Sequence, residues 1–206
     1  MDMQLDLFGG GSALVPPSGA RAEHRYYFTL LPPPLQAQNI ERGAQLLARR
    51  YGARYPTRAD RLHVSLNGIR RGAELEQERL DDALEAGAAI SRPGFDVVFD
   101  TVKTFAGNSR SKTGGRANVP TVLTCSNGAR EVVALYGDIR REMQRCGLVV
   151  DRASFVPHLT IWYGPERVPD LPLRRPFRWP VRQFWLVHTF AGQKRPEYIE
   201  EWPLGR

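Results

Sequence analysis

The chain has 206 residues, 42% of them hydrophobic, and a formal net charge of +7 at pH 7. This is enough apolar material to bury a core, and no apolar run approaches the ~20 residues that cross a bilayer. Its two cysteines are too few for a disulfide framework and lack zinc-site spacing, and the N-terminus lacks the pattern of a secretory signal. We therefore expect a cytoplasmic protein with no metal, no cofactor and no membrane segment.

The basic residues are almost all arginines: of 29, only three are lysines. The planar guanidinium suits phosphate and carboxylate groups, which is compatible with a polyanionic partner. A genome that favours arginine codons would give the same composition. Charge alone therefore does not decide the function.

Residues 1–21 are rich in glycine, proline and serine, and their composition predicts a flexible tail that precedes a folded domain over residues 22–206. The first half of that domain combines alternating apolar segments with two helical patterns. Gly52 is placed to end the first helix. The predicted elements are a strand at 25–31, a helix at 35–51, a strand at 62–69, a helix at 75–90 and a strand at 95–102.

A polar, glycine-rich basic loop at 106–118 separates this half from a second one with a similar plan. Both halves offer strands accompanied by a helix, which predicts an α+β fold with internal pseudo-symmetry. The predicted elements of the second half are a strand at 121–125, a helix at 129–146 and strands at 155–163, 183–190 and 198–202.

Two of the predicted strands carry the same short pattern, a histidine followed two positions later by a hydroxyl residue and then by an aliphatic residue. The first is His63-Val64-Ser65-Leu66 and the second is His158-Leu159-Thr160-Ile161. Residues two apart in an extended chain point to the same face, so each histidine shares a face with its hydroxyl residue. One histidine on a strand is usually structural, whereas a matched pair in two similar halves indicates an active site.

Cleavage of a phosphodiester at neutral pH needs one group to remove a proton from the nucleophile and another to protonate the leaving oxygen. Histidine can do either, and a pair predicts a bell-shaped pH dependence around neutrality. Ser65 and Thr160 could donate hydrogen bonds to the phosphate oxygens as negative charge develops. The catalytic candidates are therefore His63, His158, Ser65 and Thr160.

These motifs resemble those of the 2H phosphoesterase superfamily, which is named after two His-x-Thr/Ser-hydrophobic motifs. The similarity extends to the strand at 26–32, to Asn67-Gly68 after the first motif and to Pro157 before the second. It covers about residues 24–203 and is strongest for the bacterial RNA 2′,3′-cyclic phosphodiesterases, also called 2′-5′ RNA ligases.

The resemblance implies two pseudo-symmetric lobes of mainly antiparallel sheet, with outer helices around a central basic cleft. It implies metal-independent opening of 2′,3′-cyclic phosphate ends of RNA or nucleotides to 2′-phosphomonoesters, with possible 2′-5′ ligation. The first histidine, His63, would be the general acid and His158 the general base. Many relatives have an arginine shortly after the second motif, where Trp162-Tyr163-Gly164 stands here. The substrate therefore stays open.

Four further residues are candidates for holding the substrate. Tyr163 lies just beyond the second motif, and Lys103, Phe105 and Arg110 lie in or beside the basic loop. They could bind phosphate or stack on a base. The alternative for this group is a solvated polar loop without a function.

The tail contains Gln4-Leu5-Asp6-Leu7-Phe8, which resembles the peptide by which many bacterial DNA-metabolism proteins bind the DNA sliding clamp. An apolar anchor that folds back on the domain is the alternative. Two other functions also stay open. One is a 2H enzyme acting on another cyclic nucleotide or a 2′-5′ oligonucleotide, and the other is a non-catalytic, RNA-binding or clamp-associated adaptor.

Overall fold

The structure of the protein is a computed structural model, which describes residues 24–72, 76–106, 118–125, 129–150, 154–165, 167–190, 193 and 195–205, without the side chains of 70–72. The tail, including Gln4 to Phe8, and Arg110 lie outside these ranges. None of the described helices is long and apolar enough to cross a membrane.

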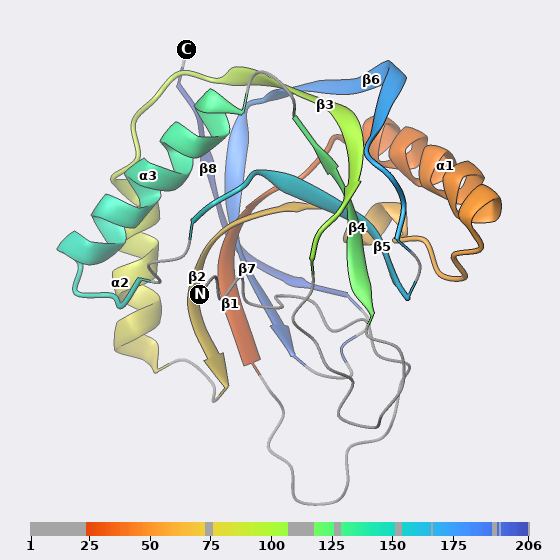
Figure 1. Cartoon of the computed structure of the whole chain (residues 1–206). Helices are drawn as coiled ribbons and strands as arrows, with labels where there is room; N and C mark the ends of the chain where they lie inside the picture. The colour runs from red at the N-terminus through yellow and green to blue at the C-terminus, as the bar shows by residue number, and fades with distance from the viewer. Residues whose placement is uncertain are drawn as a thin grey trace, which may run out of the picture.

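Two four-stranded antiparallel sheets form the centre of the molecule (Figure 1). Sheet A has the strand order β2-β1-β7-β8, and sheet B has the order β5-β4-β3-β6. The expected α+β fold is therefore confirmed. Sheet A consists of β1 (His24–Leu30), β2 (Val64–Gly72), β7 (Gln183–Phe190) and β8 (Glu197–Pro203), and sheet B of β3 (Phe95–Thr104), β4 (Val119–Thr124), β5 (His158–Gly164) and β6 (Leu171–Val181).

Three α-helices flank the sheets, with α1 on one side and α2 and α3 on the other (Figure 1). They are α1 (Pro34–Tyr51), α2 (Gln77–Ala88) and α3 (Arg130–Arg145), and a short 3₁₀ helix, η1 (Ala59–Arg61), precedes β2. The buried residues of α1 recur at the helical spacing: Ala37, Ile40, Ala44 and Ala48. Gly52 ends α1 with φ 76°, a left-handed conformation that glycine adopts without a steric penalty.

The pseudo-symmetry lies in two strand-helix-strand units, β1-α1-β2 and β4-α3-β5, in which the two strands of each unit pair antiparallel. Each unit places its motif strand, β2 or β5, at the edge of its sheet, and these two edge strands contact each other. Helix α1 packs against β5 and β6 of the opposite sheet, while α3 contacts β2 and β3. The two lobes therefore share one continuous hydrophobic core.

The sequence interpretation missed β6 entirely. Its segment contains Pro172, Pro176 and Pro180, which remove backbone donors and argue against a central strand. Because β6 is the outer strand of sheet B, pairing only with β3, its other side needs no hydrogen-bond donors. Prolines that break a central strand are thus compatible with this edge position.

Candidate active site

Both motif histidines are held in the same way by the backbone just before them. The Nδ1 atom of His63 lies 2.7 Å from the carbonyl oxygen of Arg61, and that of His158 lies 2.8 Å from the carbonyl oxygen of Val156. A carbonyl only accepts hydrogen bonds, so Nδ1 of each ring carries a proton and donates it. In each neutral imidazole, Nε2 is therefore the nitrogen that can accept a proton.

Each ring also packs against an aromatic side chain of its own sheet. The centroid of His63 lies 5.7 Å from that of Tyr27, and the centroid of His158 lies 5.1 Å from that of Phe105 in an edge-on arrangement. Two anchors, a carbonyl and an aromatic ring, thus fix the orientation of each imidazole. Such fixed rings are what proton transfer to a positioned substrate requires.

Removal from water dominates the electrostatics of both rings. Desolvation lowers the pKa of His63 from 6.5 to about 4, against the opposing effect of the hydrogen bond to Arg61, and the nearby His158 lowers it further. Desolvation also lowers the pKa of His158, against the hydrogen bond to Val156. The effect of His158 on His63 means that the two rings interact electrostatically. Both are neutral at pH 7 in the unliganded protein.

The two hydroxyl residues differ in their exposure. Ser65 is 5% exposed, and its Oγ atom is buried without a hydrogen-bond partner among the described residues, whereas Thr160 is half-buried. The Oδ1 atom of Asn67, two residues further along β2, is likewise buried without a hydrogen-bond partner among the described residues. Buried polar atoms without partners are uncommon in folded proteins, and a bound ligand could supply the missing hydrogen bonds.

A β-bulge in β5 determines where Tyr163 lies. The pairing with β4 skips Ile161, so that Val122 lies opposite Thr160 and Pro120 lies opposite Tyr163. Directly opposed residues share a sheet face, and Pro120 and Val122 are two apart on β4. Tyr163 therefore shares a face with Thr160, which strict alternation along β5 would have excluded.

The same face of sheet B carries Lys103. This lysine lies opposite Val122 on β3, in the same row as Thr160, and its Nζ atom forms an ion pair with Asp170 at 3.0 Å. Phe105 follows two residues later and contacts His158. Of the four residues expected to bind substrate, the structure thus brings Lys103, Phe105 and Tyr163 onto the His158 side, while Arg110 lies outside the described residues.

The sequence interpretation missed a hollow beside His63 on sheet A. Its lining includes Tyr27 of β1, Arg61 of η1, Val187 of β7 and Tyr198 of β8. Desolvation raises the pKa of Tyr27 and of Tyr198, so both phenols stay protonated and can donate hydrogen bonds. These residues come from elements far apart in the sequence, so no local pattern could mark them as neighbours.

Comparison with known proteins gives one family and a consistent set of folds. The sequence profile of the 2′-5′ RNA ligase superfamily matches residues 31–193. A search of curated protein sequences gives no match.

Among solved structures, E. coli LigT complexed with 3′-AMP superposes with a TM-score of 0.66 at 22% identity, covering 89% of this chain and 99% of LigT. The apo form of LigT gives a TM-score of 0.67 at 21% identity, with 90% and 100% of the two chains covered. The protein TT0787 of Thermus thermophilus gives 0.67 at 21% identity, with 87% and 97% covered. The chain belongs to the 2′-5′ RNA ligase superfamily of 2H phosphoesterases.

Proposed function

We propose that the protein is a metal-independent cyclic phosphodiesterase that opens 2′,3′-cyclic phosphate ends of RNA or nucleotides to 2′-phosphomonoesters. The observation that carries this proposal is the matched pair of histidines, each with Nδ1 bound to a backbone carbonyl, so that Nε2 is the nitrogen that exchanges protons with the substrate. Family membership supports phosphoester chemistry but leaves the reaction and substrate open.

The reaction needs one proton to be taken up and one to be delivered. Nε2 of His158 accepts a proton from water as the water oxygen bonds to phosphorus, and the carbonyl of Val156 stabilises the resulting imidazolium. The bond between phosphorus and the 3′ oxygen breaks, and Nε2 of His63 donates a proton to that oxygen. The assignment of acid and base rests on the resemblance to the superfamily.

His63 must be protonated to act as the acid, although its pKa in the unliganded protein is about 4. A bound phosphodiester carries a negative charge, and an adjacent anion raises the pKa of an imidazole. Substrate binding therefore favours the protonated form of His63. The Ser65 hydroxyl, which is buried without a hydrogen-bond partner among the described residues, can donate to a non-bridging phosphate oxygen, and Thr160 can do the same from β5.

The hollow beside His63 is shallow and open to solvent, and we propose that the nucleoside attached to the cyclic phosphate lies over it. Tyr198, which is 47% exposed, offers aromatic surface and a phenol donor, and Arg61 adds a positive charge. The similar E. coli LigT forms complexes with 3′-AMP and with ATP, which supports a nucleotide as the substrate here. Lys103 adds positive charge on the His158 side, although Asp170 partly neutralises it.

The same groups could catalyse 2′-5′ ligation. If the 5′ hydroxyl of a second RNA replaces water, His158 accepts its proton, His63 protonates the departing 3′ oxygen and a 2′-5′ phosphodiester forms. The description of the family as 2′-5′ RNA ligases favours this second activity. Hydrolysis and ligation then differ only in the nucleophile.

The test is a panel of 2′,3′-cyclic nucleotides, cyclic-phosphate-ended RNAs and 2′-5′ dinucleotides, incubated in EDTA and analysed by ³¹P NMR. We expect His63→Ala and His158→Ala each to lower kcat on the order of a hundredfold or more. The double variant should be scarcely worse, because residues that act as a unit are not additive. Ser65→Ala and Thr160→Ala should each lower kcat by a smaller factor.

His24→Ala is the matched control, because His24 contacts His188 and Phe190 and lies outside the motifs. It should retain the activity of the unaltered protein. Full activity of the double histidine variant would refute the enzymatic proposal. A 3′-phosphate product would reverse the leaving group, and cleavage of 2′-5′ dinucleotides alone would favour the alternative substrate.

A further inference from the structure

The arginines on the two sides of the molecule differ in their ion pairing. On the side of α2 and α3, several arginines bind carboxylates of the same helices or their surroundings. Their charge is therefore neutralised locally. These pairs are Arg79–Asp82, Arg92–Glu131, Arg92–Asp138, Arg141–Asp138, Arg145–Glu85 and Arg145–Glu142.

On the opposite side, exposed arginines lie in the last turn of α1, just after it, just before β6 and at the start of β6. They form no ion pair with any carboxylate of the described chain. Glu41 is the only acidic residue of α1, and β6 has none. Positive charge therefore accumulates here. We call this region the α1–β6 arginine surface, and its residues are Arg49, Arg50, Arg54, Arg167, Arg174 and Arg175.

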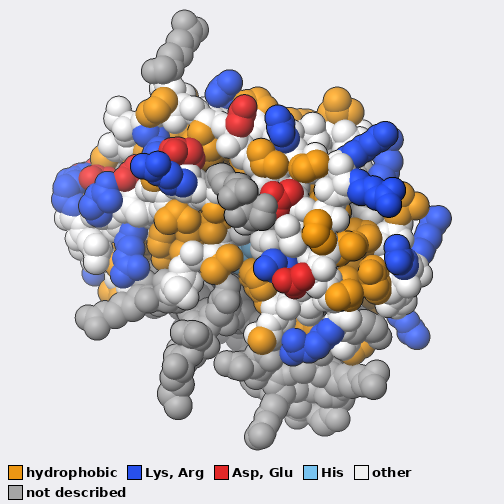
Figure 2. All heavy atoms as spheres, turned by 45° about the horizontal axis from the view of Figure 1, so that its top comes forward, with side chains coloured by type: hydrophobic (Ala, Val, Ile, Leu, Met, Phe, Trp, Pro, Cys, Tyr) orange, Lys and Arg blue, Asp and Glu red, His pale blue; other side chains and the backbone are white. Residues whose placement is uncertain are grey.

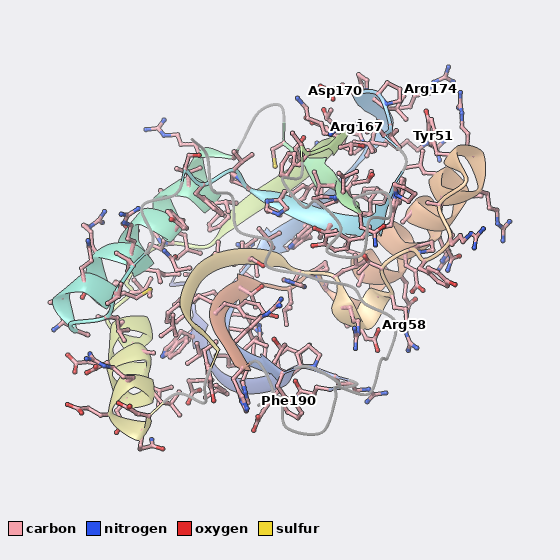
Figure 3. All side chains as sticks on the ribbon, turned by 60° about the horizontal axis from the view of Figure 1, so that its bottom comes forward. Tyr51, Arg58, Arg167, Asp170, Arg174 and Phe190 are labelled. Carbon is pink, nitrogen blue, oxygen red and sulfur yellow. The ribbon has the colours of Figure 1, made fainter. Side chains whose placement is uncertain are left out.

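The elements of this surface are packed together. Helix α1 contacts β6, and the ring of Phe177 lies so close to Gly43 that an added Cβ atom would be 2.9 Å away. Figure 3 shows Arg174 beside Tyr51, with Arg167 and Asp170 nearby. In Figure 2, the side of the molecule where α1 lies carries basic side chains without acidic ones among them, whereas both kinds mix on the side of α3.

The surface is joined to the candidate active site at two points. The backbone N–H of Thr57, shortly after α1, donates to the carbonyl of Ile161, the residue after Thr160, at 2.7 Å. The N–H of Val168, next to Arg167, donates to the Thr104 hydroxyl at 2.9 Å, beside Lys103. The arginine surface is therefore tied to β3 and β5, the two strands that carry Lys103 and Thr160.

Aromatic side chains lie among the arginines. The guanidinium of Arg50 lies over the ring of Tyr51, 5.7 Å from its centroid, and Tyr55, next to Arg54, is 80% exposed. Arginines that contact phosphates and aromatic rings on which bases stack are the two components of single-strand binding surfaces. Tyr55 thus presents an aromatic face to solvent beside Arg54.

We propose that the α1–β6 arginine surface binds the phosphates of single-stranded RNA upstream of the reacting end, so that the enzyme acts on oligoribonucleotides in preference to mononucleotides. This inference rests on the proposed function, because a 2′,3′-cyclic phosphate requires a ribose and the rest of such a molecule is RNA. The arginine surface then contributes to substrate affinity and leaves the chemical step to the histidines.

The experiment compares Arg174→Gln/Arg175→Gln with Arg130→Gln/Arg141→Gln, a control that removes the same charge from α3. The substrates are a 2′,3′-cyclic mononucleotide and a cyclic-phosphate-ended RNA of about eight nucleotides. We expect the β6 variant to raise KM about tenfold for the RNA and to leave the mononucleotide KM unchanged. In a plot of the logarithm of the RNA-binding constant against the logarithm of the salt concentration, the slope of this variant should be shallower by about 0.7 for each phosphate that it no longer neutralises.

RNA binding is measured by fluorescence anisotropy as well as by turnover, which separates the two proposals. If neither substrate is turned over but the β6 variant binds RNA more weakly than the control, the proposed function fails and the RNA surface stands. The proposed RNA surface is refuted if the β6 variant binds RNA with unchanged affinity and salt dependence. It is also refuted if the α3 control loses as much RNA affinity as the β6 variant.

Discussion

Desolvation of the His63 and His158 rings lowers the pKa of both below the ordinary 6.5, and that of His63 to about 4. Catalysis needs one ring neutral and the other protonated, a combination most populated between the two pKa values. We therefore expect the maximum of kcat/KM, which reports the free enzyme, below pH 6.5 and not around neutrality as the motifs alone suggest. The maximum of kcat should lie at higher pH, because bound phosphate raises the pKa values.

A pH profile with a 2′,3′-cyclic mononucleotide measures both quantities. A kcat/KM maximum above pH 6.5 would contradict the expected effect of burial on the two imidazoles. A profile with one limb only would mean that a single imidazole titrates in the reaction, and the acid–base pair would have to be abandoned.

The same burial predicts how stability depends on pH. The pKa of His63 is about 4 in the folded protein and near 6.5 in the unfolded chain, so the unfolded chain binds more protons between these values. The contribution of neutral His63 to stability is therefore complete above pH 6.5 and is lost as the pH falls towards 4. His63→Asn keeps a donor for the Arg61 carbonyl but does not titrate.

Urea unfolding at pH 7 and pH 5 tests this prediction. The unaltered protein should lose more free energy of unfolding between these pH values than His63→Asn does. Equal losses would show that His63 is accessible to protons in the folded protein.

Helix packing gives a prediction at the scale of elements. Gly87 of α2 faces β8, where an added Cβ atom would lie 2.5 Å from the ring of Trp202, while at Gly137 of α3 the nearest atom is 3.8 Å away. Alanine favours helices over glycine by up to about 1 kcal/mol. We expect Gly137→Ala to stabilise the protein by up to that amount, and Gly87→Ala to destabilise it by about 1–3 kcal/mol because the ring must move. Thermal unfolding of both variants measures the difference, and a stabilising Gly87→Ala would contradict the close packing of α2 on β8.

The elements also show how far the sequence could lead. Local patterns predicted the three helices and most strands, because helical spacing, alternation and Gly52 act within a few residues. The strand β6 was missed, because whether its prolines are tolerated depends on its edge position. The sequence also did not predict which strands pair with each other. β7 and β8 complete the sheet that β1 begins, and β3 joins the sheet of the second motif.

The candidate site was predictable to a similar extent. His63, Ser65, His158 and Thr160 follow from two short motifs, since same-face spacing needs no tertiary information. The location of Tyr163 depends on a bulge at Ile161, and the hollow beside His63 depends on the pairing of β1 with β7 and of β7 with β8. Residues brought together by long-range pairing leave no local signal.

At the scale of the whole molecule, the tail can be separated from catalysis by experiment. Neither histidine motif lies in residues 1–21, so their deletion should leave kcat and KM for a cyclic mononucleotide unchanged. Clamp binding through Gln4 to Phe8 has no support from the comparisons and stays a prediction. Replacing Leu7 and Phe8 by alanine should abolish a pull-down of the sliding clamp without affecting turnover. Failure of the unaltered protein to bind the clamp would end this idea.

The interleaved architecture predicts that both sheets unfold together. Helix α1 begins in the unit that forms sheet A but packs on β5 and β6 of sheet B, and buried residues of both sheets form one core. Losing either sheet would expose that core, so a two-state transition is expected. The four tryptophans divide evenly as probes, with Trp162 and Trp179 in sheet B and Trp185 and Trp202 in sheet A.

Trp162→Phe/Trp179→Phe leaves fluorescence from sheet A only, and Trp185→Phe/Trp202→Phe leaves it from sheet B only. Within each variant, the urea midpoint from fluorescence should coincide with that from far-UV circular dichroism, because the helices cannot stay folded when the sheet beneath them unfolds. The two variants act as controls for each other, since both remove two tryptophans. If fluorescence and dichroism separate in either variant, one sheet unfolds while the other persists, and the two lobes would then be independent units joined only at the β2–β5 contact.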